Sequence, residues 1–514
     1  MRKLHCVLLW TFTVVAAIRF LLWAGFIFIT IRFRGDIAYP EGARAYAVQR
    51  VATEQPLYQD FRRLPHIMVP YGPVYFYVAG LVHRWCGPEP FAAYLAGRGV
   101  SLTAFVALLV LCCIWARELA GWRFAALVTV FAAAGPKFLG PCAAAQVDSM
   151  AVLASACCLW IAARPWGAWR WSLVWLFAMV AWSTKQNAIA IVPAVAVWLL
   201  QSRQWRQAAV WLGCWSAGIA AVWWLFDWQT EGMFTLNAAV SLRRPLDPAR
   251  AVQILLEILP FVAVAFATAA WNWPRSVLDE PRRLVAWWFF FSLSLSVASC
   301  FGEGAGANYL FEPWIAACLL VPGVLGGRPV PTRVRRALAT ASASAGDGGN
   351  AATSGPRGRL APSFWLLLLI LSSAQDVLYV AGLHSSYQTS IVAKTSARER
   401  AAGLLPNVLA LMTRYPGEVF IQYPFLTLAS RREPVVLDIV HYRLMVQCGV
   451  IAPERLIERL KSRDFELVVL NTSLPERYNP DDLMRWPEPV WKALSENYSL
   501  LRTIDSTYVY VPND

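Results

Sequence analysis

Long runs of apolar residues recur along the first three quarters of the chain, separated by short segments that carry most of the charge. A helix needs about 20 mostly apolar residues to cross the hydrocarbon core of a bilayer. Runs of about this length, or slightly shorter, predict about eleven spanning helices. They lie at 6–31, 92–115, 124–141, 149–163, 170–184, 187–201, 207–226, 251–271, 284–301, 313–326 and 364–383. The pattern predicts a polytopic, all-α membrane protein.

The pattern changes beyond residue 384, where the composition becomes that of a soluble protein. Short alternating runs predict strands, and stretches of helical spacing lie between them. Mixed strands and helices over about 120 residues are typical of a small α/β domain, which we expect at 395–514. The predicted strands are EVFIQY, EPVVLDI, FELVVLN and TYVYV, and the predicted helices lie near 398–413, 453–462 and 488–497.

Two further segments interrupt the transmembrane part, which we place at 1–384. The segment 327–362 is rich in Ala, Ser, Gly and Arg. Such a composition buries no core, so it predicts a disordered linker. The long first loop, 32–91, contains helical spacing at 41–53 and an amphipathic aromatic stretch at 73–85. Both are expected to lie along the membrane surface.

Composition supports a membrane protein, with 58% hydrophobic and 15% charged residues and a mean hydropathy of +0.45. Soluble domains carry about 25% charged residues. The net charge of +14 could suggest nucleic-acid binding. Every connection on the inner side instead carries arginine, from Arg117 and Arg123 to Arg328 through Arg359, as the positive-inside rule requires. The 26 Trp are typical of an interfacial belt. This puts the N-terminus in the cytoplasm and the C-terminal domain outside.

Acidic residues gather where the outer loops meet the bilayer, and carboxylates near hydrocarbon are functional candidates. Asp36 and Glu41 follow the first helix, Asp148 opens the fourth, and Glu303 and Glu312 flank the tenth. The alternative for Asp36, Glu303 and Asp227 is ordinary loop charge, and for Asp148 an N-cap. A divalent cation, Mg or Mn, would take Asp148 and Glu41 or Asp36 as oxygen ligands.

Basic residues share this face, and Arg forks with a Lys point charge suit a phosphate. Simple snorkelling or internal pairing with Asp148 or Glu41 are the alternatives. Walker, HExxH and GxSxG motifs are absent from the sequence, and no GxGxxG follows a strand. The candidate phosphate-binding residues are Lys185, Arg98, Arg243 and Arg244.

Four segments resemble the GT-C superfamily of polyprenyl-phosphate-sugar-dependent glycosyltransferases. The branch is the bacterial one related to protein mannosyltransferases and the lipid A aminoarabinose transferase. The segments are RGDIAYPEGARAYAVQRVATEQPLYQDF followed by PYGPVYFYVAG, then QVDSMAV, STKQNAIAIVP and GEGAGANYLFEPW. One departure is that many relatives have adjacent Asp-Glu at the first site, where this chain has Pro40-Glu41-Gly42. The acting acid is therefore Glu41 or Asp36.

The resemblance implies an inner-membrane enzyme that moves a sugar from a polyprenyl phosphate to an envelope glycan, lipid or protein on the outer face. A carboxylate would accept the acceptor's proton; we expect Glu41 in this role, with Asp36 as its substitute and Asp148 as the next catalytic candidate. Cations would stabilise the leaving phosphate, with or without a divalent metal. The implied cavity-lining residues are Arg44, Tyr46, Tyr71, Asn308, Tyr309 and Glu312.

Two other function classes need comparison. A transporter or flippase of a lipid-linked or anionic substrate would also need intramembrane charges. The sequence shows no inverted repeat and no pair of Gly- or Pro-broken helices at matching positions. A non-catalytic scaffold acting through 395–514 would have lost the acidic groups, which are present. A glycosyltransferase is the reading that the residues favour.

Overall fold

The computed structural model of this 514-residue chain describes nine continuous stretches and separate positions between them. The predicted linker 327–362 and the last predicted span 364–383 lie outside the described residues. The stretches are 41–89, 91–133, 144–240, 244–256, 280–303, 305–321, 406–471, 486–504 and 507–514.

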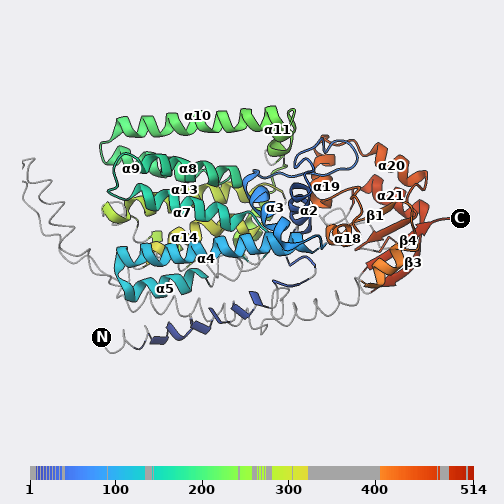
Figure 1. Cartoon of the computed structure of the whole chain (residues 1–514), viewed down its shortest axis with the longest axis horizontal. Helices are drawn as coiled ribbons and strands as arrows, with labels where there is room; N and C mark the ends of the chain where they lie inside the picture. Colours follow the sequence, from blue (N-terminus) through green and yellow to red (C-terminus); the bar gives the residue numbers. More distant parts are fainter. Residues whose placement is uncertain are drawn as a thin grey trace, which may run out of the picture.

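A bundle of helices forms the larger part of the molecule, with long helices lying side by side along its longest axis (Figure 1). Within the described residues, their bounds follow the predicted apolar runs. They are α4 (Ala92–Ala120), α5 (Trp122–Ala133), α7 (Asp148–Ala162), α8 (Arg170–Thr184), α9 (Ile191–Gln201), α10 (Trp205–Gln229), α13 (Glu280–Cys300) and α14 (Phe311–Leu320).

Three of the described helices are long and apolar enough to cross a membrane: Ala92–Leu119, Trp205–Gln229 and Arg282–Cys300. The bundle core is built from their apolar side chains and those of the shorter helices, with Trp288 and Trp314 fully enclosed. Burial of these faces is the main stabilising contribution inside the bundle, because close packing maximises dispersion contacts there.

The first loop folds into α2 (Glu41–Ala52) and α3 (Val74–Cys86), which confirms the two helices predicted at 41–53 and 73–85. The structure differs in where α2 lies. Ten of its twelve residues are buried, and it stands between the bundle and the C-terminal domain (Figure 1). Pro424 of the C-terminal domain is in contact distance of Gly42, because a Cβ on that glycine would lie 2.8 Å from the proline Cβ.

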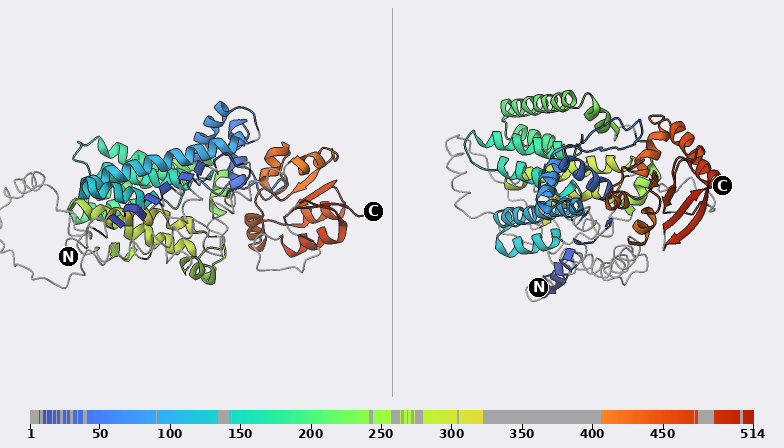
Figure 2. Two further views of the ribbon diagram at one scale, coloured as in Figure 1. Left: turned by 90° about the horizontal axis from the view of Figure 1, so that it is seen from below. Right: turned by 45° about the vertical axis from the view of Figure 1, so that its right-hand side comes forward.

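The C-terminal domain contains a four-stranded sheet in the order β1-β2-β4-β3. Strands β1 (Val419–Ile421) and β2 (Leu467–Leu470) are parallel, whereas β4 (Thr507–Pro512) is antiparallel to both β2 and β3 (Tyr498–Ile504). Its helices are α18 (Pro424–Ser430), α19 (Ile439–Gln447), α20 (Glu454–Lys461) and α21 (Glu488–Asn497). Figure 2 shows this domain at one end of the bundle.

Two details of the predicted C-terminal domain are wrong. The run 433–439 is not a strand; only Val436 forms an isolated bridge, with His66 of the first loop, since Pro434 has no N–H to offer a ladder. Strand β3 and helices α18 and α19 were not predicted. Phe61, Met68 and Val240, from loops at the same end of the bundle, share one apolar core with the domain, so domain and loops pack as one unit.

Candidate active site

Asp148 and Lys185 form a buried ion pair at the end of the bundle that faces the C-terminal domain. Asp148 opens α7 and Lys185 follows α8, so the antiparallel run of these two helices brings the residues together. The Lys185 Nζ lies 2.6 Å from Oδ1 of Asp148, and Asn308 Nδ2 donates to the same oxygen over 3.0 Å. The other oxygen, Oδ2, is buried with no hydrogen-bond partner among the described residues.

A small polar cavity of about 30 Å³ opens beside this pair. Asn308 and Tyr309 reach it from the short 3₁₀ helix η2 (Ala307–Leu310), and the Lys185 ammonium lies 4.7 Å from the centre of the Tyr309 ring. Glu312 enters from α14 and accepts a 2.6 Å hydrogen bond from the indole of Trp288. The remaining polar lining comes from Asn187, Ser292, Ser296 and Ser299.

Arg44 on α2 is a buried cation with free donors. Its Nη2 donates to the Tyr71 hydroxyl over 2.8 Å, whereas Nε and Nη1 are buried and have no partner among the described residues. Asp148 is close enough for its charge to act on Arg44, and Tyr71 is likewise close to Lys185. The two cations therefore face one region of the site.

Gly72 explains how Tyr71 reaches this region. A Cβ on Gly72 would lie 2.1 Å from the carbonyl oxygen of Ser183, at the end of α8. Such a distance is far inside van der Waals contact, so only glycine allows the first loop to approach the helix so closely. The approach puts Tyr71 beside Lys185, two residues beyond Ser183.

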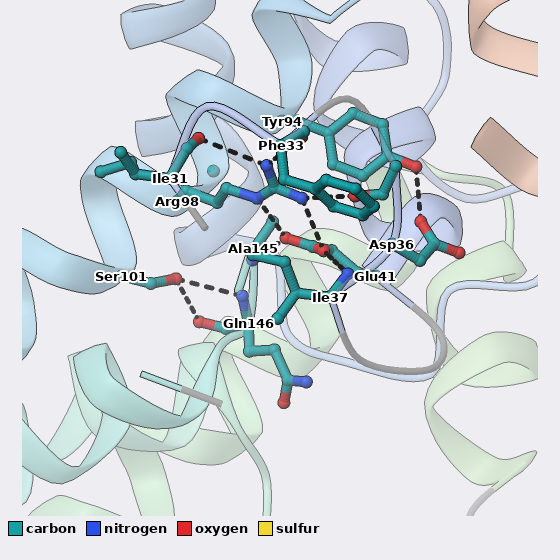
Figure 3. A network of polar contacts seen from close by, with 12 residues as sticks. Ile31, Phe33, Asp36, Ile37, Glu41, Tyr94, Arg98, Ser101, Ala145 and Gln146 are labelled. Atoms are coloured by element: carbon teal, nitrogen blue, oxygen red, sulfur yellow. Dashed lines mark hydrogen bonds and ion pairs between the residues drawn. The ribbon is translucent and has the colours of Figure 1, made fainter. Parts of the chain in front are cut away.

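Glu41 and Arg98 form a second buried pair, wholly enclosed (Figure 3). Both oxygens of Glu41 are fully used: they accept from Arg98 and from the backbone N–H groups of Ile37 and Ala145, the latter two over 2.7 Å. A carboxylate offers about four acceptor sites, so this one has none left for a substrate.

Arg98 is equally occupied, because a guanidinium has five N–H donors and all of them are engaged. Besides the two bonds to Glu41, they go to the carbonyl oxygens of Ile31, Phe33 and Gly35. Arg98 therefore ties Ile31, Phe33 and Gly35, in the segment before α2, to α4. It does not present an N–H toward the Asp148–Lys185 cavity.

Asp36 lies in the segment that Arg98 holds. It accepts a 2.6 Å hydrogen bond from the Tyr94 hydroxyl (Figure 3) and keeps part of its surface exposed. Removal from water, together with the negative charge of Glu41, raises the pKa of Asp36 to about 7. A carboxyl group that titrates near neutral pH is suited to accept a proton.

The other predicted site residues lie elsewhere. Tyr46 is on the opposite side of α2 from Arg44 and interacts with Arg50. Arg244 reaches the C-terminal domain, where its Nη2 lies 2.8 Å from Nε2 of His441. Asp227 accepts from the backbone of Thr235 at α11 (Met233–Ala238). Arg243 lies outside the described residues.

The described residues do not fit the divalent cation considered from the sequence. They contain no group of three or more His, Cys, Asp or Glu side chains placed to hold a metal. Glu41 has no free oxygen, and the one unpartnered oxygen of Asp148 stands beside an ammonium and near a guanidinium. A dication would be repelled there, so these residues do not form a site for it.

Sequence reasoning missed Tyr94, which positions Asp36. The signal was available: Tyr94 stands four residues before Arg98, so both side chains share one face of α4. The Arg98 guanidinium lies 5.0 Å from the centre of the Tyr94 ring. The pair of Asp438 and His441, which meets Arg244, carried no recognisable spacing in the sequence.

By sequence, no protein-family profile and no curated protein matches the chain. Its fold is similar to that of ArnT from Cupriavidus metallidurans bound to undecaprenyl phosphate. The TM-score is 0.60 at 13% identity, and 97% of each chain is covered. It is also similar to the Archaeoglobus fulgidus oligosaccharyltransferase in the apo form, with a TM-score of 0.52 at 11% identity. That match covers 98% of this chain and 74% of the other. Both are GT-C glycosyltransferases, so the fold implied by the resemblance is confirmed.

Proposed function

We propose that the chain is an integral-membrane glycosyltransferase that moves a sugar from a polyprenyl phosphate to an acceptor on the outer face of the inner membrane. The observation that carries the proposal is Arg44, a buried cation with two donor nitrogens, Nε and Nη1, that have no hydrogen-bond partner among the described residues. It stands beside the Asp148–Lys185 pair in a fold that, in the ArnT crystal structure, holds undecaprenyl phosphate. Unpartnered buried donors are costly unless a ligand satisfies them.

The phosphate would be bound by Arg44 and Lys185. The Arg44 Nε and Nη1 groups offer two charge-assisted hydrogen bonds to phosphate oxygens, and Lys185 offers a point charge. Asp148 and Asn308 hold Lys185 and its surroundings in place through the 2.6 Å and 3.0 Å contacts. Tyr71 orients Arg44 from the other side.

Asp36 is the proposed base, because the four hydrogen bonds of Glu41 leave that carboxylate no acceptor site. The acceptor's oxygen or nitrogen attacks the anomeric carbon, and the bond from that carbon to the phosphate oxygen breaks. The acceptor's proton passes to Asp36, and the electron pair of the broken bond leaves with the polyprenyl phosphate. Arg44 and Lys185 stabilise the charge that develops on this leaving group. Glu41 and Arg98 position Asp36.

The test incubates purified protein with a panel of polyprenyl-phosphate sugars and with envelope glycans, lipids and proteins as acceptors. Release of free polyprenyl phosphate is measured by mass spectrometry. We expect release by the wild type and a loss of about 10²–10⁴-fold in Asp36→Asn. Asp60→Asn, in the same loop but paired with Arg62 at the surface, is the matched control and keeps activity.

The same preparation separates the alternative function. A flippase of a lipid-linked or anionic substrate would move the intact donor across a vesicle bilayer without breaking its sugar–phosphate bond. Donor translocated intact, with no release in the presence of any acceptor, would favour that alternative over the transferase.

A further inference from the structure

A large groove lies between α8 and α10, at the periphery of the bundle. Its volume is about 930 Å³. The helix α10 is the least enclosed of the three long apolar helices: 11% of its most apolar stretch is buried inside the protein, against 50% for Ala92–Leu119 and 44% for Arg282–Cys300. Figure 1 shows α10 along one edge of the bundle. Its outer surface is therefore available to lipid.

The walls of the groove are apolar for most of its length. They consist of Trp175, Val210, Trp211, Cys214, Ala217, Gly218 and Ala221. Polar groups occur at one end only, where Arg206, Gln207 and Ser172 line it beside Trp171. An apolar slot that ends in a cation matches the shape of a lipid with a negatively charged headgroup.

The groove is built into the packing of the two helices. The indole N–H of Trp175 donates to the carbonyl oxygen of Cys214 over 3.0 Å. A Cβ on Gly218 would lie 2.7 Å from the Trp175 ring, so the glycine lets the ring lie directly against α10. This contact fixes the floor, and the small side chains of Ala217 and Ala221 leave the space above it open.

Arg206 lines the charged end of the groove, and a second cation lies near it. Arg206 is exposed and lies 5.0 Å from the centre of the Trp205 ring. On the neighbouring helix, the Arg170 guanidinium lies 5.3 Å from the centre of the Trp171 ring. Tryptophan and arginine together are typical of the headgroup level of a bilayer. The charged end therefore lies where a lipid phosphate would be.

The dimensions agree with an acyl chain. From Arg206 to Ala221 the helix rises by about 22 Å, which exceeds the depth of one leaflet of a hydrocarbon core about 30 Å thick. The candidate active site lies at the other end of α8, because Lys185 follows the end of that helix and Trp171 is near its start. A donor with its phosphate at Arg44 and Lys185 would have its headgroup far from Arg206.

We infer that this groove binds one anionic phospholipid of the bilayer, with the phosphate beside Arg206 and one acyl chain along the Trp175–Gly218 floor. This site is separate from the proposed reaction, and its test does not depend on transferase activity. The occupant is a glycerophospholipid such as phosphatidylglycerol, chosen over a zwitterionic lipid because, among the described residues, the one charged side chain that lines the groove is a cation.

The test uses native mass spectrometry of the full chain in detergent, after removal of bound lipid and addition of phosphatidylglycerol or phosphatidylethanolamine. We expect one phosphatidylglycerol to survive activation that strips phosphatidylethanolamine. Arg206→Gln should lower its occupancy about tenfold, as the loss of a charge-assisted contact implies. Arg203→Gln, an exposed arginine at the same helix end but outside the groove, should leave occupancy unchanged.

A second set of variants tests the apolar part of the groove. Ala217→Trp, or Ala221→Leu if the first fails to fold, should fill the slot and reduce retention. Leu212→Trp, on an exposed face of α10 that does not line the groove, should not. Equal retention of the two lipids, equal effects of Arg206→Gln and Arg203→Gln, or displacement of phosphatidylglycerol by polyprenyl phosphate would each overturn the inference.

Discussion

Glu41 and Arg98 meet in a bidentate ion pair, with Nε to Oε1 at 2.8 Å and Nη2 to Oε2 at 2.9 Å, and neither side chain is exposed. Breaking one partner of such a pair leaves an uncompensated charge inside the protein, which costs about 3–5 kcal/mol. The pair lies at the point where the segment before α2, α2 itself, α4 and the segment before Asp148 converge. Its contribution is to hold these parts together.

Glu41→Ala should therefore lower the stability of the protein, instead of removing a catalytic base from a protein of normal stability. We expect the free energy of unfolding in detergent to fall by about 3–5 kcal/mol, measured by denaturant titration, with Arg98→Ala similar in size. The double variant should lose less than the sum of the two single changes, because it leaves no unpaired charge. A Glu41→Gln protein of wild-type stability with no activity would instead identify Glu41 as the base.

Asp36 gives a prediction about pH and stability. Its pKa is raised from 3.8 to about 7 in the folded protein. Between these values the folded state keeps a proton that the unfolded state has lost, so the free energy of unfolding falls as pH rises from about 4 to about 7. Asp36→Asn should flatten the dependence in this window. Thermal unfolding of both proteins across the range measures it, and a parallel decline would contradict the assignment.

The apolar pattern predicted the bundle well because each helix needs a long apolar surface, which faces either the protein core or lipid. The gathering of Asp148, Lys185 and Asn308 was also predictable, since all three stand at helix ends or connections on one side. The full hydrogen bonding of Glu41 was not predictable. Its partner Arg98 is 57 positions away, and the N–H of Ala145 that completes its bonding carries no sequence signal.

The same limit applies to the C-terminal domain. Apolar runs such as 433–439 look like strands in isolation, but Pro434 breaks the ladder and Leu437 donates instead to the carbonyl oxygen of His66, over 3.1 Å. That pairing depends on how the first loop packs against the domain. Sequence reasoning about one segment has no access to it.

Arg44 is expected to determine the affinity for the lipid phosphate. Arg44→Lys keeps the charge but removes the paired N–H geometry, so binding of polyprenyl phosphate should weaken about tenfold or more, measured by titration in detergent. Arg50→Lys on the same helix is the control: that arginine donates to Pro56 and Gln59 and faces away from the site. It should lose stability without losing affinity, and an equal loss of affinity in both variants would argue against Arg44.

Gly72 should tolerate no side chain. Gly72→Ala puts a methyl group 2.1 Å from the Ser183 carbonyl oxygen, so the first loop must shift and carry Tyr71 away from Lys185. We expect a clear loss of stability and of polyprenyl phosphate binding together. Gly99→Ala on α4 meets nothing within 4 Å and should be neutral or stabilising by about 0.5–1 kcal/mol. Equal behaviour of the two variants would show that the loop does not need the close approach.

Arg244 should hold the C-terminal domain against the loops of the bundle. Its Nη2 lies 2.8 Å from Nε2 of His441, whose Nδ1 lies 2.7 Å from Asp438 at the start of α19. Because arginine has only donors, Nε2 accepts, and Nδ1 therefore carries a hydrogen and donates to Asp438. Arg244→Ala removes the donor to Nε2 of His441 and should lower the free energy of unfolding by about 1–3 kcal/mol. The readout is faster hydrogen exchange in Ile439–Gln447.

The control for that change is Arg250→Ala, in the helical segment that follows Arg244, whose side chain donates only to its neighbour Gln253 among the contacts described. Its exchange pattern should match the wild type. Binding of polyprenyl phosphate by Arg244→Ala tells the two roles of this arginine apart. A protein that exchanges faster but still binds polyprenyl phosphate normally has lost only a contact between domains. Weakened phosphate binding with unchanged exchange would return Arg244 to the phosphate-binding residues that the sequence first suggested, because a phosphate ligand need not stabilise the free protein.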